Sequence, residues 1–262
     1  SSMPKEVVFI HGAFAGPWCW DQYKSCFQDL GWTCHTPALR YHDVDPSDEP
    51  NPDLADTSIR DYADDIAAFV GELDSPPIII GHAVGALIAQ QVASRRPTSG
   101  LVLINPNAAW GMLPATDDER AVARTFMESG PFWKAPMRVA FDLIAPFAFN
   151  KLDGDTQKQV FSRLVPESGR VMFEMFFWMF DDNRTIAIDF DKVGCPVLVV
   201  AGEEDRAVRH AVGKEIAEKY GNKGSFLLAA GHAHFLFIEP GWEQIAKHCE
   251  NWMSETASRA RS

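Results

Sequence analysis

Short apolar runs that alternate with helical patterns constrain the fold of this chain more than any other feature of its sequence. Several runs are almost continuously apolar, as expected for parallel strands buried on both faces. The runs that predict strands cover residues 7–10, 33–36, 78–80, 101–104, 197–200 and 225–228. Helical patterns cover residues 18–30, 58–73, 84–95, 208–220 and 241–256. This alternation predicts an α/β fold, a three-layer sandwich around a mostly parallel central sheet with right-handed crossovers.

One connection in this alternation is far longer than the others. Between residues 105 and 193 no run predicts a strand, and helical patterns rich in Phe, Trp and Met fill the segment. We therefore expect residues 4–106 and 192–258 to form the α/β core and residues 107–191 to form an inserted helical cap, or lid. Ahead of the core, residues 1–3 look like two residues left by cloning, followed by the start methionine.

Composition and charge narrow the classes of function. The 262 residues suffice for one domain with an inserted subdomain, and the formal net charge of −12 argues against binding to nucleic acid or anionic membranes. No apolar run reaches the ~18 residues that span a bilayer, and no signal peptide precedes the first predicted strand. The five cysteines lack paired spacing, which favours free thiols and a cytoplasmic location. We expect a monomer or a homodimer.

The segment Gly81-His82-Ala83-Val84-Gly85 joins a predicted strand to a predicted helix. Its glycines permit a tight turn, and in serine hydrolases a turn of this pattern carries the nucleophile at its centre. The central residue here is Ala83, and a methyl group cannot attack a carbonyl carbon. An ordinary strand-to-helix turn is the alternative when this motif is considered alone. The pattern thus predicts the scaffold of a hydrolase in which the reactive oxygen is missing.

A candidate acid follows the predicted strand at 197–200. Asp205 lies just beyond its carboxyl end, where functional groups gather in α/β folds. Glu203 and Glu204 are neighbouring carboxylates that could take the same role, and a solvated acidic turn is the alternative. Asp205 is the acid that we expect to orient a catalytic histidine.

A candidate base and candidate oxyanion donors complete the constellation. His232 and His234 both follow the last predicted strand, and only one of them is expected to act as the base. The backbone N–H groups of Ala13 and Val84 are the expected oxyanion donors, because Val84 begins a helix whose dipole favours negative charge. His11 is expected to support the loop around Ala13 rather than to act as a base.

Across nearly its whole length the chain resembles the α/β-hydrolase superfamily. It is most similar to the small cofactor-independent branch of methylesterases, hydroxynitrile lyases and related bacterial esterases and lactonases. The segments that carry the resemblance are His11-Gly12-Ala13-Phe14 with Trp18-Cys19-Trp20, the turn from Gly81 to Gly85, Gly202 to Asp205, and His234 to Pro240. The order nucleophile, acid, histidine is also the order of that fold. In such families the catalytic histidine precedes a Glu-Pro pair by about the number of residues in one helical turn. This spacing implies that His234, rather than His232, is the catalytic histidine.

The chain departs from the family pattern at Ala83, where the family has serine. Two explanations compete: an engineered replacement that disables the enzyme, or a natural alanine in a protein that binds without turnover. The otherwise intact constellation around one missing oxygen favours the first. An aspartate as the parent residue at position 83 is disfavoured, because relatives with an aspartate nucleophile usually have a proline shortly after the His-Gly pair and a tryptophan after the nucleophile. This chain has Phe14 and Val84 at those places.

The resemblance implies a serine hydrolase that cleaves a carboxylic ester or lactone through an acyl-enzyme and needs neither metal nor cofactor. Thioester and amide substrates stay open, because the same triad serves them all. The alternatives are a ligand-binding pseudoenzyme, a lyase in which His234 and Asp205 transfer protons, and cofactor-free oxygenation. The aromatic content of the predicted cap indicates a hydrophobic or aromatic small-molecule substrate. The residues expected to contact it are Phe14, His82, Trp110, Phe132, Trp133, Phe177 and Trp178.

Overall fold

The computed structural model describes residues 5–113, 117–128 and 130–259, and the predicted cloning remnant at 1–3 lies outside them. A six-stranded sheet in the order β2-β1-β3-β4-β7-β8 forms the centre of the fold, and every neighbouring pair is parallel. The strands are β1 (Glu6–Ile10), β2 (Thr33–His35), β3 (Ile78–His82), β4 (Gly100–Ile104), β7 (Val197–Gly202) and β8 (Gly224–Ala229). All six predicted strands are therefore confirmed, as is the α/β class.

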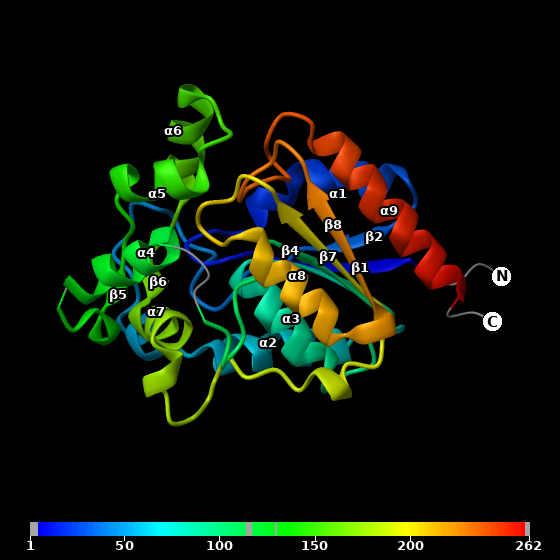
Figure 1. The fold of residues 1–262 in the computed structure, drawn as a ribbon, viewed down its shortest axis with the longest axis horizontal. Coiled ribbons are helices and arrows are strands. Elements are labelled where there is room, and N and C mark those ends of the chain that lie inside the picture. The colour runs from blue at the N-terminus through cyan, green and yellow to red at the C-terminus, as the bar shows by residue number, and fades with distance from the viewer. Residues whose placement is uncertain (1–4, 114–116, 129, 260–262) are drawn as a thin grey trace.

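Helices cover both faces of the sheet, as Figure 1 shows. Helices α1 (Asp21–Asp29) and α9 (Trp242–Arg259) lie on one face, and α2 (Ile59–Gly71), α3 (Val84–Ala93) and α8 (His210–Lys219) lie on the other. Helix α2 starts with a capping box: the Ser58 side chain accepts a hydrogen bond from the helix backbone, and the Asp61 carboxylate accepts one from the Ser58 N–H. The middle strands are fully buried, which explains why their sequences are apolar on both faces.

The long connection between β4 and β7, residues 105–196, is called the insertion below. It holds the helices α4 (Asp117–Glu128), α5 (Phe141–Ala148), α6 (Gly154–Arg163) and α7 (Gly169–Phe176). Figure 1 shows it as a separate group of helices beside the carboxyl ends of the strands. It also contains a small antiparallel sheet, β5 (Pro136–Met137) with β6 (Glu167–Ser168), where the sequence predicted no strand. Two residues per strand are too few to produce a detectable alternation.

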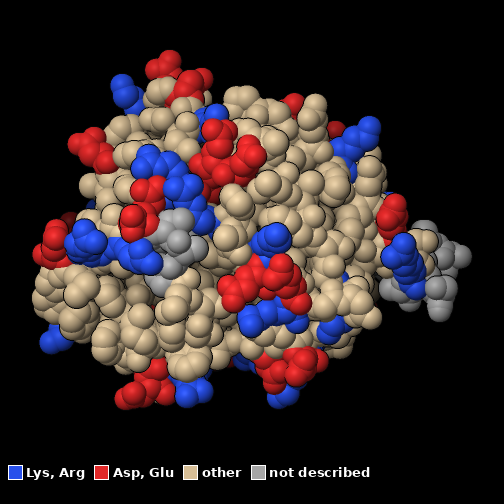
Figure 2. Space-filling model, viewed as in Figure 1, with Lys and Arg blue, Asp and Glu red and all other residues tan. Residues whose placement is uncertain are grey.

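Charged side chains of both signs are interspersed on the face shown in Figure 2. On this face acidic and basic side chains therefore lie close to one another rather than in broad areas of one sign. Among the described residues, no helix is both long and apolar enough to cross a lipid bilayer.

Candidate active site

The turn between β3 and α3 holds Ala83 in a strained conformation. Its φ of 54° and ψ of −116° lie in a region that residues with a side chain rarely adopt, at a cost of about 1–3 kcal/mol. The Ala83 N–H donates to the carbonyl of Ile104 on the neighbouring strand, at 3.1 Å. Backbone strain that the surrounding structure maintains is typical of a functional turn.

The two glycines of this turn are required by close backbone approach. A Cβ added at Gly81 would lie 2.3 Å from the carbonyl oxygen of Gly85, and one added at Gly85 would lie 2.3 Å from that of Ile10. No real Cβ tolerates such a contact with backbone. The backbone geometry of this turn therefore requires glycine at both positions.

His234 and Asp205 form a buried pair at the ends of β8 and β7. The Nδ1 atom of His234 lies 2.8 Å from Oδ2 of Asp205, which is completely buried. The other oxygen of Asp205 accepts hydrogen bonds from the backbone N–H groups of Ala207 at 2.8 Å and Val208 at 3.0 Å. Donors on both oxygens suit an ionised carboxylate, so Nδ1 of His234 donates and its Nε2 is left as the basic atom.

The competing residues are engaged elsewhere. The Nδ1 atom of His232 lies 3.0 Å from Oε1 of Glu239, which also accepts from the Ala233 N–H at 2.8 Å. Glu204 forms an ion pair with Lys151 at 2.9 Å, and Glu203 is exposed. The geometry therefore pairs Asp205 with His234, whereas His232 pairs with Glu239.

Two further side chains fix the backbone of His234. Its carbonyl oxygen accepts from Nε2 of His82 at 2.8 Å and from Nδ2 of Asn105 at 2.8 Å. Oδ1 of Asn105 accepts from the N–H of Gly202 at 2.7 Å, which ties the ends of β4, β7 and β8 together. Burial, helped by the nearby His234, holds the pKa of His82 well below its usual value, so His82 is neutral. Asn105 is not among the site residues predicted from the sequence, although it directly follows a predicted strand.

The expected oxyanion donors lie on two segments beside Ala83. Among the described residues, the N–H groups of Ala13 and Val84 donate to no other group, and Val84 is the first residue of α3. His11 supports the loop before Ala13: Nε2 accepts from the Leu39 N–H at 3.0 Å and Nδ1 donates to the Gly12 carbonyl at 2.8 Å. Burial, with the nearby His42, lowers the pKa of His11 to about 3, which keeps it neutral.

A cavity of about 130 Å³ lies over these groups. Ala13, Ala83 and His234 line one end of it, and apolar side chains of the insertion form its wall. Those side chains include Leu143, Ile144, Phe147, Met172, Met175 and Phe176. No charged side chain occurs among the described residues that line it, so a neutral, apolar ligand fits best.

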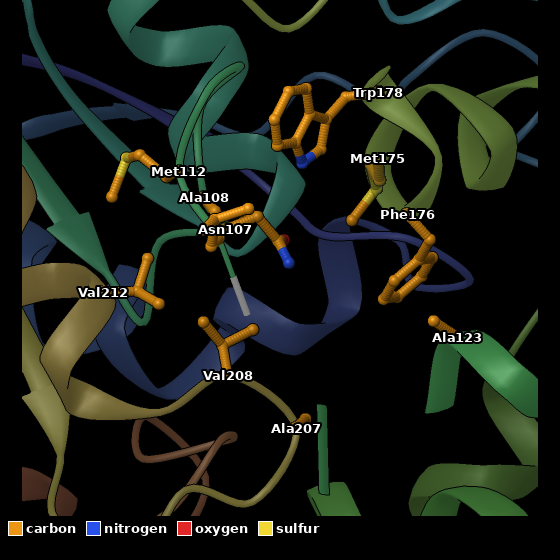
Figure 3. A pocket seen from close by; sticks show the side chains of 11 residues that line it. Asn107, Ala108, Met112, Ala123, Met175, Phe176, Trp178, Ala207, Val208 and Val212 are labelled. Atoms are coloured by element: carbon orange, nitrogen blue, oxygen red, sulfur yellow. The ribbon is translucent and has the colours of Figure 1, made fainter. Parts of the chain in front are cut away.

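A smaller cavity of about 70 Å³ adjoins the first (Figure 3). Asn107, Met175, Phe176, Ala207 and Val208 line both cavities. Figure 3 shows Trp178, Met175 and Phe176 on one side of the smaller cavity and Val208 and Val212 on the other.

The residues predicted to contact substrate divide into two groups. Phe14 and His82 line the main cavity, and Trp178 lines the smaller one. The other four, Trp110, Phe132, Trp133 and Phe177, line neither cavity. They contact other aromatic rings instead: Phe132 lies 5.2 Å from Trp133 and 5.6 Å from Phe177 between ring centroids, and Trp110 lies 5.2 Å from Trp178. These four residues pack against aromatic rings of the insertion, and their contact with substrate stays a prediction.

Most residues of the cavity wall were not predicted from the sequence, although the spacing of apolar residues on α7 indicates three of them. Met172, Met175 and Phe176 follow the i, i+3, i+4 spacing of one helix face, and all three line the main cavity. Phe173 points elsewhere and packs on Trp133. Helical periodicity within the aromatic-rich run could therefore have separated residues facing the cavity from those packing within the insertion.

Residues 7–246 match the model of the alpha/beta hydrolase family, and the chain belongs to that family. A stretch of 80 residues is 34% identical to methylesterase 18 of Arabidopsis thaliana, and this match spans 30% of the chain but only 29% of that protein.

The solved structures of several enzymes have the same fold. A thermophilic esterase from Thermogutta terrifontis has a TM-score of 0.71 at 15% identity, covering 98% of this chain and 92% of that one. A monoacylglycerol lipase from Paleococcus ferrophilus has a TM-score of 0.71 at 18% identity, covering 97% and 96%. Tomato methylketone synthase I, in a variant complexed with beta-ketoheptanoate, has a TM-score of 0.72 at 14% identity, covering 98% and 99%. At these identities the likeness concerns the fold, which esterases and lipases share.

Proposed function

We propose that this chain is the scaffold of a carboxylic ester hydrolase in which Ala83 replaces a nucleophilic serine. The observation that carries the proposal is the buried pair of His234 and Asp205 in the same cavity as the strained Ala83. Only an oxygen atom on the Ala83 side chain is missing from the set of groups that acyl transfer needs.

The strain at Ala83 supports serine as the parent residue. Glycine adopts a positive φ without the steric penalty that a Cβ introduces. A side chain held there at a cost of about 1–3 kcal/mol suggests that the turn serves to present that side chain. Alanine differs from serine by one oxygen, so the substitution disables the reaction and preserves the turn.

The proposed mechanism follows from this arrangement. In an Ala83→Ser variant the hydroxyl oxygen attacks the carbonyl carbon, and Nε2 of His234 accepts the hydroxyl proton. The N–H groups of Ala13 and Val84 bind the oxyanion, a contribution worth about 3 kcal/mol per donor in other enzymes. Collapse of the tetrahedral intermediate expels the alcohol, which takes the proton from His234. Water then attacks the acyl-enzyme with the same histidine as base, and Asp205 stabilises the imidazolium in both steps.

The substrate class follows from the cavity. Its wall is apolar, and the described residues lining it supply no cation to pair with a carboxylate. We therefore favour neutral esters or lactones with a hydrophobic or aromatic group, and we assign the insertion the role of a cap over the site. The five cysteines are all free thiols, and this agrees with the cytoplasmic location that we propose.

The first test is a paired assay of this chain and its A83S variant on aryl esters, alkyl esters and lactones. We expect hydrolysis by A83S alone, and a covalent adduct with a fluorophosphonate at position 83 that mass spectrometry detects. The double variant A83S/H234A is expected to lose the activity, and A83S/H232A to keep it. Failure of A83S to hydrolyse any substrate or to form the adduct would contradict the proposal.

A lyase is the second candidate, because Ala83 leaves the pair of His234 and Asp205 intact without a nucleophile. In this reaction His234 would move a proton at the substrate, and no acyl-enzyme would form. The similar structure of methylketone synthase I was solved with beta-ketoheptanoate, but the described residues lining the cavity here supply no cation, so neutral hydroxynitriles are the substrates to try first. Release of a carbonyl compound by the unmodified chain, lost in H234A and without incorporation of oxygen from labelled water, would favour the lyase.

A further inference from the structure

A buried carboxylate of the insertion contacts the loop that follows β1. Glu167 on β6 is completely buried and accepts hydrogen bonds from four donors. Its Oε1 lies 3.3 Å from the Phe14 N–H and 2.9 Å from Nε2 of His42. Its Oε2 accepts from the Tyr62 hydroxyl at 2.5 Å and from the Ser168 N–H at 2.8 Å. One side chain thus joins the insertion to three segments of the α/β core and to its own strand.

His42 carries a positive charge in this cluster. Its Nδ1 lies 2.8 Å from the carbonyl oxygen of Arg40, which can only accept, and its Nε2 lies 2.9 Å from the Glu167 carboxylate. Both ring nitrogens therefore donate. Burial alone would lower the pKa of His42, but the charge of Glu167, the hydrogen bond to it and the hydrogen bonds to the backbone together raise that pKa. The two side chains form a fully buried ion pair.

The insertion holds both backbone polar atoms of Phe14. The Phe14 N–H donates to Glu167, and its carbonyl accepts from the Val165 N–H at 2.9 Å. Phe14 has a φ of 64°, a strained conformation for a residue with a side chain. It directly follows Ala13, whose own N–H is a proposed oxyanion donor. On the other side of Ala13, the Gly12 carbonyl is held by His11.

We propose that Glu167 is a positioning residue that fixes the direction of the Ala13 N–H by holding Phe14 in its strained conformation. Docking of the insertion onto the α/β core and completion of the oxyanion site would then be one event. The structural part of this inference stands on the contacts of Glu167, and its catalytic consequence rests on the proposed hydrolase function.

Glu167→Gln is the variant that separates these contacts. With its amide oxygen toward Tyr62 and Ser168, glutamine keeps both of those hydrogen bonds. Its NH₂ group then donates a hydrogen bond to Nε2 of a neutral His42. The same NH₂ group also faces the Phe14 N–H, and because both groups are donors, no hydrogen bond forms between them. The variant therefore leaves no buried charge unpaired, which favours folding. Of the four groups that donate to Glu167, only the Phe14 N–H is left without a hydrogen-bond partner.

Glu174→Gln is the matched control. Glu174 lies on α7 of the insertion, is buried, and accepts from the Ser58 hydroxyl at 2.7 Å and the Ile59 N–H at 2.9 Å. It ties the insertion to α2 by the same kind of contact but has no hydrogen bond to the loop after β1. A merely structural role of Glu167 would make the two variants behave alike.

The first measurement is amide hydrogen exchange in the unmodified Ala83 chain, read at Phe14. We expect E167Q to accelerate this exchange by at least about tenfold while E174Q leaves it unchanged. Unchanged exchange at Phe14 in E167Q, or equal acceleration in both variants, would overturn the inference. This readout needs no catalytic activity and is therefore independent of the proposed function.

The second measurement uses the A83S background and an aryl ester. We expect E167Q to lower kcat by about tenfold or more with little change in KM, because a misdirected oxyanion donor weakens only the transition state. E174Q is expected to keep kcat within about twofold. Equal kcat in the two variants would overturn the positioning role, whereas inactivity of A83S itself would count against the hydrolase and leave the exchange result to decide the role of Glu167.

Discussion

Asn105 connects the carbonyl of His234 to the N–H of Gly202, with hydrogen bonds of 2.8 and 2.7 Å. Its Nδ2 also reaches the carbonyl of Ala233 at 3.0 Å. The loop after β8 is thereby held against the end of β7, a few residues before Asp205. Asn105, which directly follows β4, therefore helps to hold His234 at a fixed distance from Asp205.

Asp205→Asn in the A83S background should abolish most of the hydrolysis. The amide cannot hold His234 in the correct tautomer, and the corresponding change in a serine protease lowers kcat about 10⁴-fold. Steady-state kinetics with an aryl ester measure the effect. Glu204→Gln, which removes a surface ion pair with Lys151, is the control and should stay within about twofold.

Gly85→Ala should destabilise the fold strongly. The added Cβ would lie 2.3 Å from the Ile10 carbonyl oxygen, so β1 and α3 must separate. We expect a loss of more than about 3 kcal/mol in the free energy of unfolding, measured by denaturant titration. Gly154→Ala is the control, because no atom lies within 4 Å of the added Cβ there. A stability loss in G85A no larger than that in G154A would contradict the close backbone approach.

The ion pair of His42 and Glu167 should stabilise the fold in a defined pH window. Because the pKa of His42 is raised in the folded chain, protonated His42 contributes its full stabilisation below the unfolded pKa of 6.5. This stabilisation is lost as pH rises through the folded pKa. Burial would raise the pKa of Glu167, but the charge and hydrogen bond of His42, with the hydrogen bonds from Tyr62 and Ser168, together lower it. The stabilisation by ionised Glu167 is therefore lost as pH falls below 4.5 through the folded pKa.

The stability difference between this chain and His42→Gln should therefore be largest between about pH 4.5 and 6.5 and should shrink on both sides. Chemical denaturation across the pH range measures it, with the exposed His248→Gln as control. In the same range His11, with its pKa near 3, should make the fold less stable as pH falls below 6.5, because only the unfolded chain binds that proton. A pH-independent difference for H42Q would contradict the charged state of His42.

Met175→Trp in the A83S background should narrow the range of substrates. Met175 lines both cavities, so a larger ring there removes space for a bulky group. We expect the ratio of kcat/KM for a long-chain ester to that for an acetate to fall about tenfold or more. Phe173→Trp places the same ring on the same helix beside Trp133, away from the cavities, and should leave this ratio unchanged. Equal ratios in the two variants would show that substrate does not occupy this wall.

The sequence by itself determined the order of strands and helices along the chain and the glycine-containing turn at 81–85. It also determined the chain positions of the candidate acid and base. Apolar runs such as that at 78–80 can be buried only in a sheet covered on both faces, and the spacing from His234 to Pro240 identified the paired histidine. These signals are local, because each depends on residues that lie close together in the sequence. The aromatic-rich run of α7 was also visible, but composition without periodicity could not show which of its rings face a cavity.

Only the tertiary structure decided which distant residues meet. Phe14, His42, Tyr62 and Glu167 come from segments up to 153 residues apart, and no motif marks any of them as partners. The sequence likewise could not show that the Trp133 side chain is 43% exposed whereas Phe176, in the same insertion, lines the cavity. The physical reason is that hydrophobicity and charge decide that a side chain must be buried or paired, whereas the packing of the whole chain decides with what.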